Sequence, residues 1–323
     1  MALHPELEAF LDLADDNAAS GPLPFHESTA QQAREVFEQT TRQLAWSLPD
    51  GVEWRDLAAR SRDGQAVPLR LYLPRGHASG ELPVMVYFHG GGYVVGSIDS
   101  HDGVCREFCA RTPCAVLSVG YRRAPEHKFP TALHDCADAV AWLHENAQAL
   151  GLDRQRVIFA GDSVGASLAT TLATQAVHQP REVAIRPQLQ MLCYPMTDAS
   201  RRSVSVELFA EGYLLESETL EWFYTQYANT AQERQDWRFS PLLAPDLRGV
   251  APALVVLAGF DPLLDEGREY AARLQEAGVD VELIEYAGLT HDLLRLRSVV
   301  GDVAEIHQVL AERLHGMLEK SMR

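Results

Sequence analysis

Short apolar runs alternate with longer amphipathic segments between Leu82 and Gly288. The runs are rich in β-branched residues, as buried strands are, whereas residues 130–150 and 265–278 carry apolar side chains at helical spacing. Residues 52–74 predict two further strands, antiparallel to each other and at the sheet edge. Strands separated by helices favour an α/β fold with a mostly parallel central sheet flanked by helices. The strands expected in the alternating region cover 83–88, 114–121, 156–161, 189–195, 253–259 and 279–287.

Two stretches of the chain fall outside this alternation. Residues 1 to about 48 predict two helices, and the segment from about 200 to 245 contains an amphipathic helix with Ser217 as its expected N-cap. Because neither stretch has a strand of its own, we expect both to pack as a helical cap over one end of the sheet, where ligands bind in open α/β folds. The predicted organisation is a single domain over residues 1–323 that includes this cap.

The composition is that of a globular protein with a large core and an acidic surface. The chain has 323 residues, of which 46% are hydrophobic, and a formal net charge of −17. This charge argues against nucleic acid or an anionic membrane as a partner, because either would require a basic surface. The N-terminus lacks a basic region followed by an apolar core, and no stretch approaches the roughly 18 apolar residues of a membrane helix. We therefore expect a cytoplasmic protein whose partner is a small neutral molecule.

The cysteines indicate neither a disulfide framework nor a metal site. There are five of them, an odd number, and no pair has C-x-x-C spacing. We expect reduced, mostly buried thiols and no bound metal.

Ser163 lies in a G-x-S-x-G pattern between Gly161 and Gly165. The pattern follows the strand expected at 156–161 and precedes a segment rich in helix-forming residues, which places the serine at a sharp turn from strand to helix. Such a turn raises the hydroxyl above the end of the sheet, and the two glycines let the strand and the helix approach closely. The pentapeptide alone is weak evidence, but its context predicts that Ser163 is a nucleophile.

The base that would take the proton of Ser163 is expected to be a histidine. In enzymes built around such a turn, the acid and then the histidine follow the serine along the chain. His178 ends the helix after the serine and precedes any acid of the right placement, and His307 and His315 lie in an amphipathic C-terminal helix. His291 remains, in the loop after the last expected strand.

The carboxylate that would orient His291 has three candidates. Asp261 stands just past the end of the strand at 253–259, and Pro262 ends the extended segment there. Asp265 and Glu266 are expected to begin the next helix, where their charges stabilise its positive end. Asp261 is therefore favoured over both neighbours.

A histidine and three glycines, His89 to Gly92, follow the strand at 83–88. Bare backbone amides there can stabilise a negative oxygen in a tetrahedral intermediate, because no side chain obstructs them. The N–H of Val164, after the nucleophile, supplies another donor. A phosphate-binding loop is the competing interpretation, but the Lys-Ser/Thr ending is absent. His89 is expected to support the loop as a hydrogen-bond donor.

The chain resembles the bacterial hormone-sensitive-lipase-like esterases, also called family IV carboxylesterases. The resemblance is carried, in this order, by HGGGY, YRRAPEH, GDSVG, DPLLDEG and His291. The resemblance runs from about Leu82 to His291. It implies an α/β-hydrolase fold with a helical cap, a preference for short acyl chains, no cofactor, and a homodimer formed through the last strand. The roles it implies are nucleophile for Ser163, base for His291, acid for Asp261, and oxyanion hole for Gly91, Gly92 and Val164. From their place in the loop, His89 and Gly90 are expected to support it.

The sequence departs from this family at three positions. Val164 stands where alanine is usual, which predicts a narrower acyl pocket. Asp292 stands where glycine follows the histidine, which predicts a shifted loop or an altered pKa of His291. Arg123 replaces a usual leucine.

The predicted activity is a serine carboxylesterase that hydrolyses short-chain esters through an acyl-enzyme. An amide, a lactone or an acetylated sugar remains an alternative substrate for the same residues. A ligand receptor of this fold, similar to the plant gibberellin receptors, is a further alternative, but those receptors lack the histidine that is present here as His291.

Overall fold

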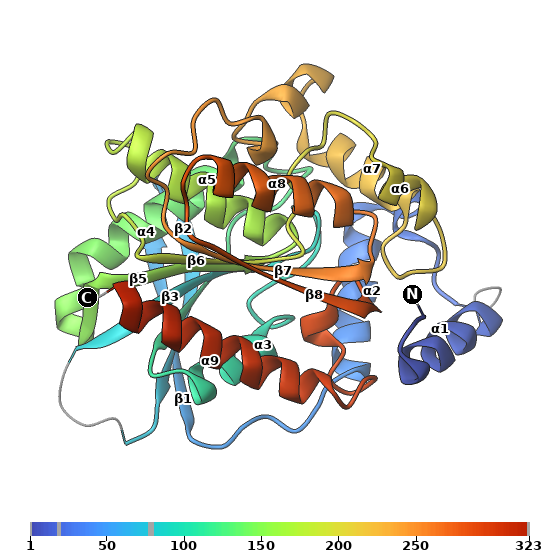
Figure 1. The fold of residues 1–323 in the computed structure, drawn as a ribbon, viewed down its shortest axis with the longest axis horizontal. Helices are drawn as coiled ribbons and strands as arrows, with labels where there is room; N and C mark the ends of the chain where they lie inside the picture. The colour runs from blue at the N-terminus through green and yellow to red at the C-terminus, as the bar shows by residue number, and fades with distance from the viewer. Residues whose placement is uncertain (1, 18–20, 77–80, 322–323) are drawn as a thin grey trace.

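One sheet of eight strands organises the computed structural model, which describes residues 2–17, 21–76 and 81–321 (Figure 1). The strand order is β1-β2-β4-β3-β5-β6-β7-β8. From β4 to β8 neighbouring strands pair in parallel, whereas β1 and β2 form an antiparallel hairpin that joins β4. The predicted sheet and its edge hairpin are therefore confirmed. The strands are β1 (Val52–Arg60), β2 (Ala66–Pro74), β3 (Leu82–Phe88), β4 (Ala115–Val119), β5 (Leu152–Asp162), β6 (Leu189–Cys193), β7 (Ala253–Phe260) and β8 (Val281–Thr290).

Helices cover both faces of the sheet, so its central strands are buried on both sides. Along β3, Val84 and Val86 belong to the core on one face, and Met85 and Tyr87 belong to the core on the other. This double burial explains why the strands are continuous apolar runs rather than alternating patterns. One face is covered by α4 (Thr131–Leu150), α5 (Val164–His178) and α8 (Leu264–Glu276), and the other by α3 (Asp102–Arg111) and α9 (Val303–Ser321) (Figure 1).

The two stretches without strands lie near one another beside the carboxyl ends of β7 and β8 (Figure 1). The ring centroids of Phe25, from the first stretch, and Phe223, from the second, are 6.1 Å apart. Ser217 begins a helix rather than capping it: Glu216 is the N-cap, and the Ser217 hydroxyl donates to the carbonyl of Val206. The elements are α1 (Pro5–Asn17), η2 (Phe25–Glu27) and α2 (Ala30–Gln43), then α6 (Val204–Leu208), α7 (Ser217–Tyr227), η3 (Ala231–Gln235) and η4 (Pro241–Leu243).

Parallel strands bring their carboxyl ends to the same edge of a sheet. Ser163, Asp261 and His291 each follow directly after such an end, those of β5, β7 and β8. The topology therefore places all three at one edge, next to the cap segments. A short helical turn, η5 (Leu293–Arg295), follows His291.

The five cysteines are buried with free thiols. In the parts of the chain that the structure describes, no helix has the length and apolar character needed to cross a bilayer.

Candidate active site

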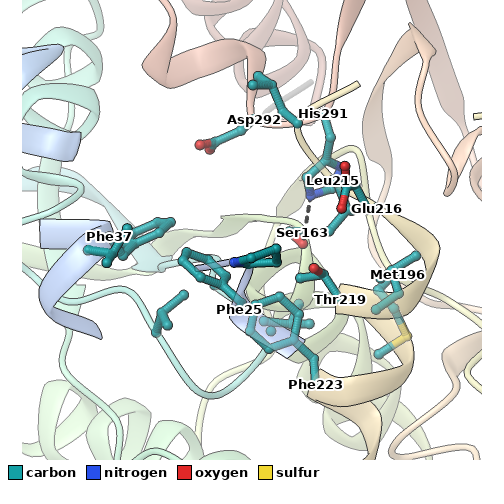
Figure 2. A pocket seen from close by; sticks show the side chains of 18 of the residues that line it. Phe25, Phe37, Ser163, Met196, Leu215, Glu216, Thr219, Phe223, His291 and Asp292 are labelled. Atoms are coloured by element: carbon teal, nitrogen blue, oxygen red, sulfur yellow. Dashed lines mark hydrogen bonds between the residues drawn. The ribbon is translucent and has the colours of Figure 1, made fainter. Parts of the chain in front are cut away.

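Ser163, His291 and Asp261 form a continuous hydrogen-bonded row. The Oγ of Ser163 lies 3.0 Å from Nε2 of His291 (Figure 2). The Nδ1 of His291 lies 2.8 Å from Oδ2 of Asp261. If Nδ1 donates to the carboxylate, Nε2 is free to accept the serine proton, as a general base must. The structure thus brings together the three residues that the sequence predicted as nucleophile, base and acid.

The turn at Ser163 is conformationally strained. Its φ is 54°, in the left-handed region that non-glycine residues rarely adopt. A Cβ on Gly165 would collide with the carbonyl oxygen of Phe88, and one on Gly161 would collide with the backbone of Gly165. The two glycines of the pattern are therefore required by close packing of β3, β5 and α5.

Asp261, rather than its acidic neighbours, reaches the histidine. Asp265 and Glu266 lie in the first turn of α8. Asp265 accepts a hydrogen bond from the backbone N–H of Ser205 in α6, and Glu266 accepts one from the backbone N–H of Thr197. Glu266 is buried, and burial raises its pKa to about 8. Both neighbours therefore hold other backbone segments in place, and only Asp261 of the three contacts His291.

The electrostatic surroundings of His291 stabilise its protonated form. Burial of the ring lowers the pKa of His291, but the carboxylates of Asp261, Asp292 and Asp162 raise it by more, so the net shift is upward. Asp292 has φ 67°, the conformation that glycine adopts most easily, and aspartate is among the few other residues that tolerate it. Of the two effects predicted for Asp292, the structure therefore supports a change in the pKa of His291.

The glycine loop after β3 presents unobstructed backbone amides to the serine. Gly91 and Gly92 have φ values of 111° and 59°. A Cβ on Gly92 would collide with the ring of Phe223 from α7. Within the described parts of the chain, no residue accepts a hydrogen bond from the N–H groups of Gly91, Gly92 or Val164, and all three residues line the same cavity as Ser163. These amides are therefore available to a ligand oxygen.

His89 and Gly90 fix the base of this loop. The Nδ1 of His89 lies 2.8 Å from the carbonyl oxygen of Gly90, and the His89 ring stacks on Tyr121 with centroids 4.2 Å apart. Burial lowers the pKa of His89 to about 3, so the ring stays neutral and hydrogen-bonds within the loop. Arg123 contacts the same loop, donating to the carbonyl of Gly96 at 2.6 Å.

Asp162, the residue before the nucleophile, ties the glycine loop to β5. Its Oδ1 accepts hydrogen bonds from the N–H of Gly90 at 3.0 Å and the hydroxyl of Tyr87 at 2.7 Å, and its Oδ2 lies 3.2 Å from Nε2 of His101. Burial alone would raise the pKa of Asp162, but His101 and Tyr87 hold it down to about 2. Sequence reasoning missed this role. The available signal was a charged residue inside a pattern of buried residues, which requires partners.

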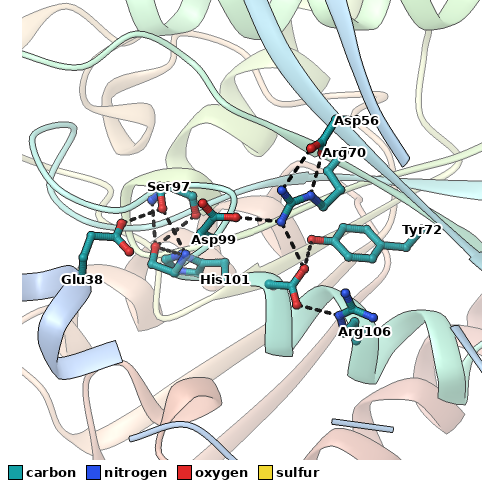
Figure 3. A network of polar contacts seen from close by, with 10 residues as sticks. Glu38, Asp56, Arg70, Tyr72, Ser97, Asp99, His101 and Arg106 are labelled. Carbon is teal, nitrogen blue, oxygen red and sulfur yellow. Dashed lines mark hydrogen bonds and ion pairs between the residues drawn. The ribbon is translucent and has the colours of Figure 1, made fainter. Parts of the chain in front are cut away.

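A polar network links the buried pair of His101 and Asp162 to the cap helix α2. The hydroxyl of Ser97 donates to Glu38 of α2 at 2.6 Å, and the hydroxyl of Ser100 lies 2.9 Å from Nδ1 of His101 (Figure 3). On the other side of the same segment, Arg70 from β2 pairs with Asp99 at 2.7 Å. The segment between β3 and α3 is thereby held by both the cap and the sheet.

A cavity of about 360 Å³ opens above Ser163 (Figure 2). Its wall is mostly apolar and comes largely from the two cap stretches, whereas the serine, the histidine and the glycine loop form the rest. An apolar wall with a few convergent polar groups is the usual form of a small-molecule site. The cap contributes Pro22, Leu23, Pro24, Phe25, Val36, Phe37, Leu214, Leu215, Glu216, Thr219, Leu220, Phe223 and Tyr224.

Three of the described side chains, His101, Asp162 and Asp292, lie close enough together to hold a metal ion. Each already has a partner in the protein. His101 contacts Asp162, and Asp292 pairs with Arg295 at 2.7 Å. Protein contacts therefore account for this group.

Comparison with known proteins identifies relatives over nearly the whole chain. The sequence profile of the alpha/beta hydrolase fold family matches residues 85–295. An ethyl acetate hydrolase from Pseudomonas putida is 45% identical over 97% of this chain and 99% of its own length. A carboxylic ester hydrolase from Mycobacterium tuberculosis is 40% identical over 83% of this chain and 72% of its own length. A solved ester hydrolase from the Lake Arreo metagenome, in complex with a bipyridine phosphonate derivative, is 35% identical, with a TM-score of 0.92 over 97% of this chain and 98% of its own.

Proposed function

This chain belongs to the alpha/beta hydrolase fold family and is a carboxylic ester hydrolase, and we propose that Ser163, His291 and Asp261 form its catalytic triad. The observation that carries the proposal is the hydrogen-bonded row from Ser163 through His291 to Asp261, at a cavity that also exposes free amides. The family membership agrees with the resemblance to hormone-sensitive-lipase-like esterases.

The proposed reaction proceeds through an acyl-enzyme. His291 takes the proton of Ser163 while the serine oxygen attacks the ester carbonyl, and the carbonyl oxygen becomes an oxyanion. The amides of Gly91, Gly92 and Val164 stabilise that oxyanion, and His291 then donates its proton to the departing alcohol. Water, activated by the same histidine, hydrolyses the acyl-enzyme and releases the acid.

We propose short-chain esters as substrates, and Val164 supports this because it is a branched side chain in the cavity wall next to the nucleophile. A series of p-nitrophenyl esters of increasing acyl length tests it. We expect kcat/KM to be largest at about two to six acyl carbons, since the acyl chain of the substrate must fit in the cavity beneath the cap. A maximum at long chains would contradict the proposal. An anilide, a lactone and an acetylated sugar in the same series test the alternative substrates.

We predict that, on the acid side of the pH profile (its acid limb), kcat/KM falls to half its maximum at a pH above 6.5. His291 acts as a base only when neutral, and its pKa is raised from the ordinary value of 6.5, so activity is lost as the pH falls through the raised pKa. Acid release from ethyl acetate, followed in a pH-stat, measures the profile with an alcohol that does not titrate. A flat profile would disprove this assignment of the base, and half-maximal activity below pH 6.5 would contradict the raised pKa of His291.

The Gly92→Ala variant should lose at least about a hundredfold in kcat, the typical cost of one missing oxyanion donor. The added methyl would collide with Phe223 and strain a backbone with φ 59°, which displaces the amide. Gly212→Ala is the matched control, because Gly212 has φ 82° but open space around its Cβ position. Equal losses in both variants would mean that backbone strain alone, and not the oxyanion hole, explains the effect.

We also propose that the protein is cytoplasmic and forms a homodimer through β8, the dimer being what the resemblance implies. Two features support the choice of β8: it is the last strand at one edge of the sheet, and its Leu283 is 42% exposed. Light scattering on the purified protein measures the mass of the assembly, and a monomer at all concentrations would disprove the dimer.

A further inference from the structure

One buried arginine joins the loop of His291 to the cap. Arg295, in η5, is 7% exposed. Its Nη1 donates to Asp292, the residue after His291, at 2.7 Å, and its Nη2 donates to the hydroxyl of Thr41 in α2 at 2.6 Å. Its guanidinium also lies over the ring of Phe37 in α2, 4.2 Å from the ring centroid. A single side chain therefore contacts both the histidine loop and the cap helix.

The same helix also holds the glycine loop. Arg34 of α2 donates to the carbonyl of Val94 at 2.9 Å and to the carbonyl of Ala124 at 2.7 Å. The N–H of Val94 in turn donates to the carbonyl of Gly91 at 3.0 Å. Phe37 lines the cavity and contacts both Arg295 and His101, whose ring is stacked on it with centroids 6.5 Å apart. Helix α2 thus contacts the supports of both the expected base and the expected oxyanion hole.

We propose that Arg295 is a positioning residue that holds His291 in its catalytic geometry by fixing Asp292 against helix α2 of the cap. This inference rests on the proposed function, since it concerns the position of the catalytic base. The base is then aligned only while α2 is seated over the cavity.

The chemistry of arginine suits this position. A guanidinium can donate to a carboxylate and a hydroxyl at once while its flat face stacks on an aromatic ring, and an ammonium cannot do all three. A buried hydrogen-bonding group that loses its partner is costly, so the contacts stay together in the folded protein. A lysine at position 295 would therefore keep the positive charge but lose the simultaneous contacts with Asp292 and with Thr41 and Phe37 of α2.

Arg295 also balances a charge that acts on His291. The carboxylate of Asp292 raises the pKa of His291, and Arg295 neutralises that carboxylate. Without the arginine, Asp292 would stabilise the protonated histidine more strongly, and the acid limb would move to higher pH. The other titratable groups near His291 are Asp261, Asp162 and His101 in the buried core, Tyr194 against its ring, and Glu216 of the cap on the cavity wall.

The central experiment compares kcat, KM and the pH profile of wild type, Arg295→Met and the double variant Arg295→Met with Asp292→Asn, using p-nitrophenyl acetate. Methionine keeps the apolar stem over Phe37 and removes both hydrogen bonds. We expect Arg295→Met to lower kcat about tenfold with a smaller change in KM, since small misplacements of a reacting group cost factors of this size or more. We expect its acid limb to move up in pH, and the second substitution to bring the limb back.

Variants of α2 test the connection without touching the histidine loop. Thr41→Val removes the hydroxyl that Arg295 contacts, and we expect kcat to fall severalfold while the acid limb stays in place, because the Arg295–Asp292 pair remains. Thr41→Ser keeps the hydroxyl and should restore wild-type kcat. Thr40→Val, one residue earlier and exposed on the same helix, controls for a valine in α2.

The outcomes separate this inference from the proposed function. Unchanged kcat and an unmoved acid limb in folded Arg295→Met would overturn the inference while leaving ester hydrolysis intact. A loss of melting temperature alone, with normal kinetics below the transition, would likewise overturn it. If Arg295→Met does not fold, the Thr41 pair decides: equal kcat in Thr41→Val and Thr41→Ser would overturn the inference. If the Ser163→Ala variant instead hydrolysed esters as fast as the wild type, the proposed function would be overturned.

Discussion

The Ser163→Ala variant should lose about 10⁶-fold in kcat for p-nitrophenyl acetate, as expected when a triad nucleophile is removed. The substitution removes only the attacking oxygen. Alanine keeps the Cβ, so the strained turn at φ 54° is no worse than in wild type, and the protein should fold normally. The loss is measured by comparing the initial rate of the variant with that of wild-type enzyme whose active-site concentration has been titrated. The cavity and free amides remain, so a small rate above that of water should persist.

Ser118→Ala is the matched control for this experiment. Ser118 is fully buried in β4 and does not line the cavity that contains Ser163. Its replacement should therefore leave kcat unchanged. Substantial turnover by Ser163→Ala would mean that another group attacks the ester.

The Asp261→Asn variant should lose about 10⁴-fold in kcat, the size of effect known for the corresponding change in a serine triad. The carboxylate that holds Nδ1 of His291 at 2.8 Å becomes a neutral amide, so it no longer selects the required tautomer or stabilises the imidazolium. Steady-state kinetics with p-nitrophenyl acetate measure the loss, and near-ultraviolet circular dichroism checks the fold.

Asp265→Asn tests the alternative assignment of the acid. Asp265 begins α8 and accepts a backbone hydrogen bond rather than one from His291. We expect a change in kcat of less than tenfold. A larger loss in Asp265→Asn than in Asp261→Asn would reverse the two roles.

The sheet could be predicted from the sequence because its strands are buried on both faces and therefore stand out as apolar runs. Helix α3 could not. Its buried apolar residues, Val104, Cys105, Phe108 and Cys109, share a ten-residue segment with charged residues, and so short a segment gives only a weak helical pattern. Its burial against α9 is a tertiary contact that the local sequence does not encode.

The row from Ser163 to Asp261 could be predicted because each member directly follows a strand end and the chain order of such residues is restricted. The supporting contacts could not. His101 meets Asp162 across 61 positions of the chain, and Arg295 meets Thr41 across 254. Pairings of this kind depend on the register of the sheet and the docking of the cap, so no local motif reveals them.

Covalent acylation of Ser163 can be tested with a phosphonate ester that mimics the tetrahedral intermediate. Intact-protein mass spectrometry and peptide mapping follow the labelled enzyme, with Ser163→Ala in parallel. We expect one phosphonyl group per chain, located on Ser163, with activity lost in proportion and no labelling of Ser163→Ala. Loss of activity with the label on another residue, or full labelling of Ser163→Ala, would contradict it.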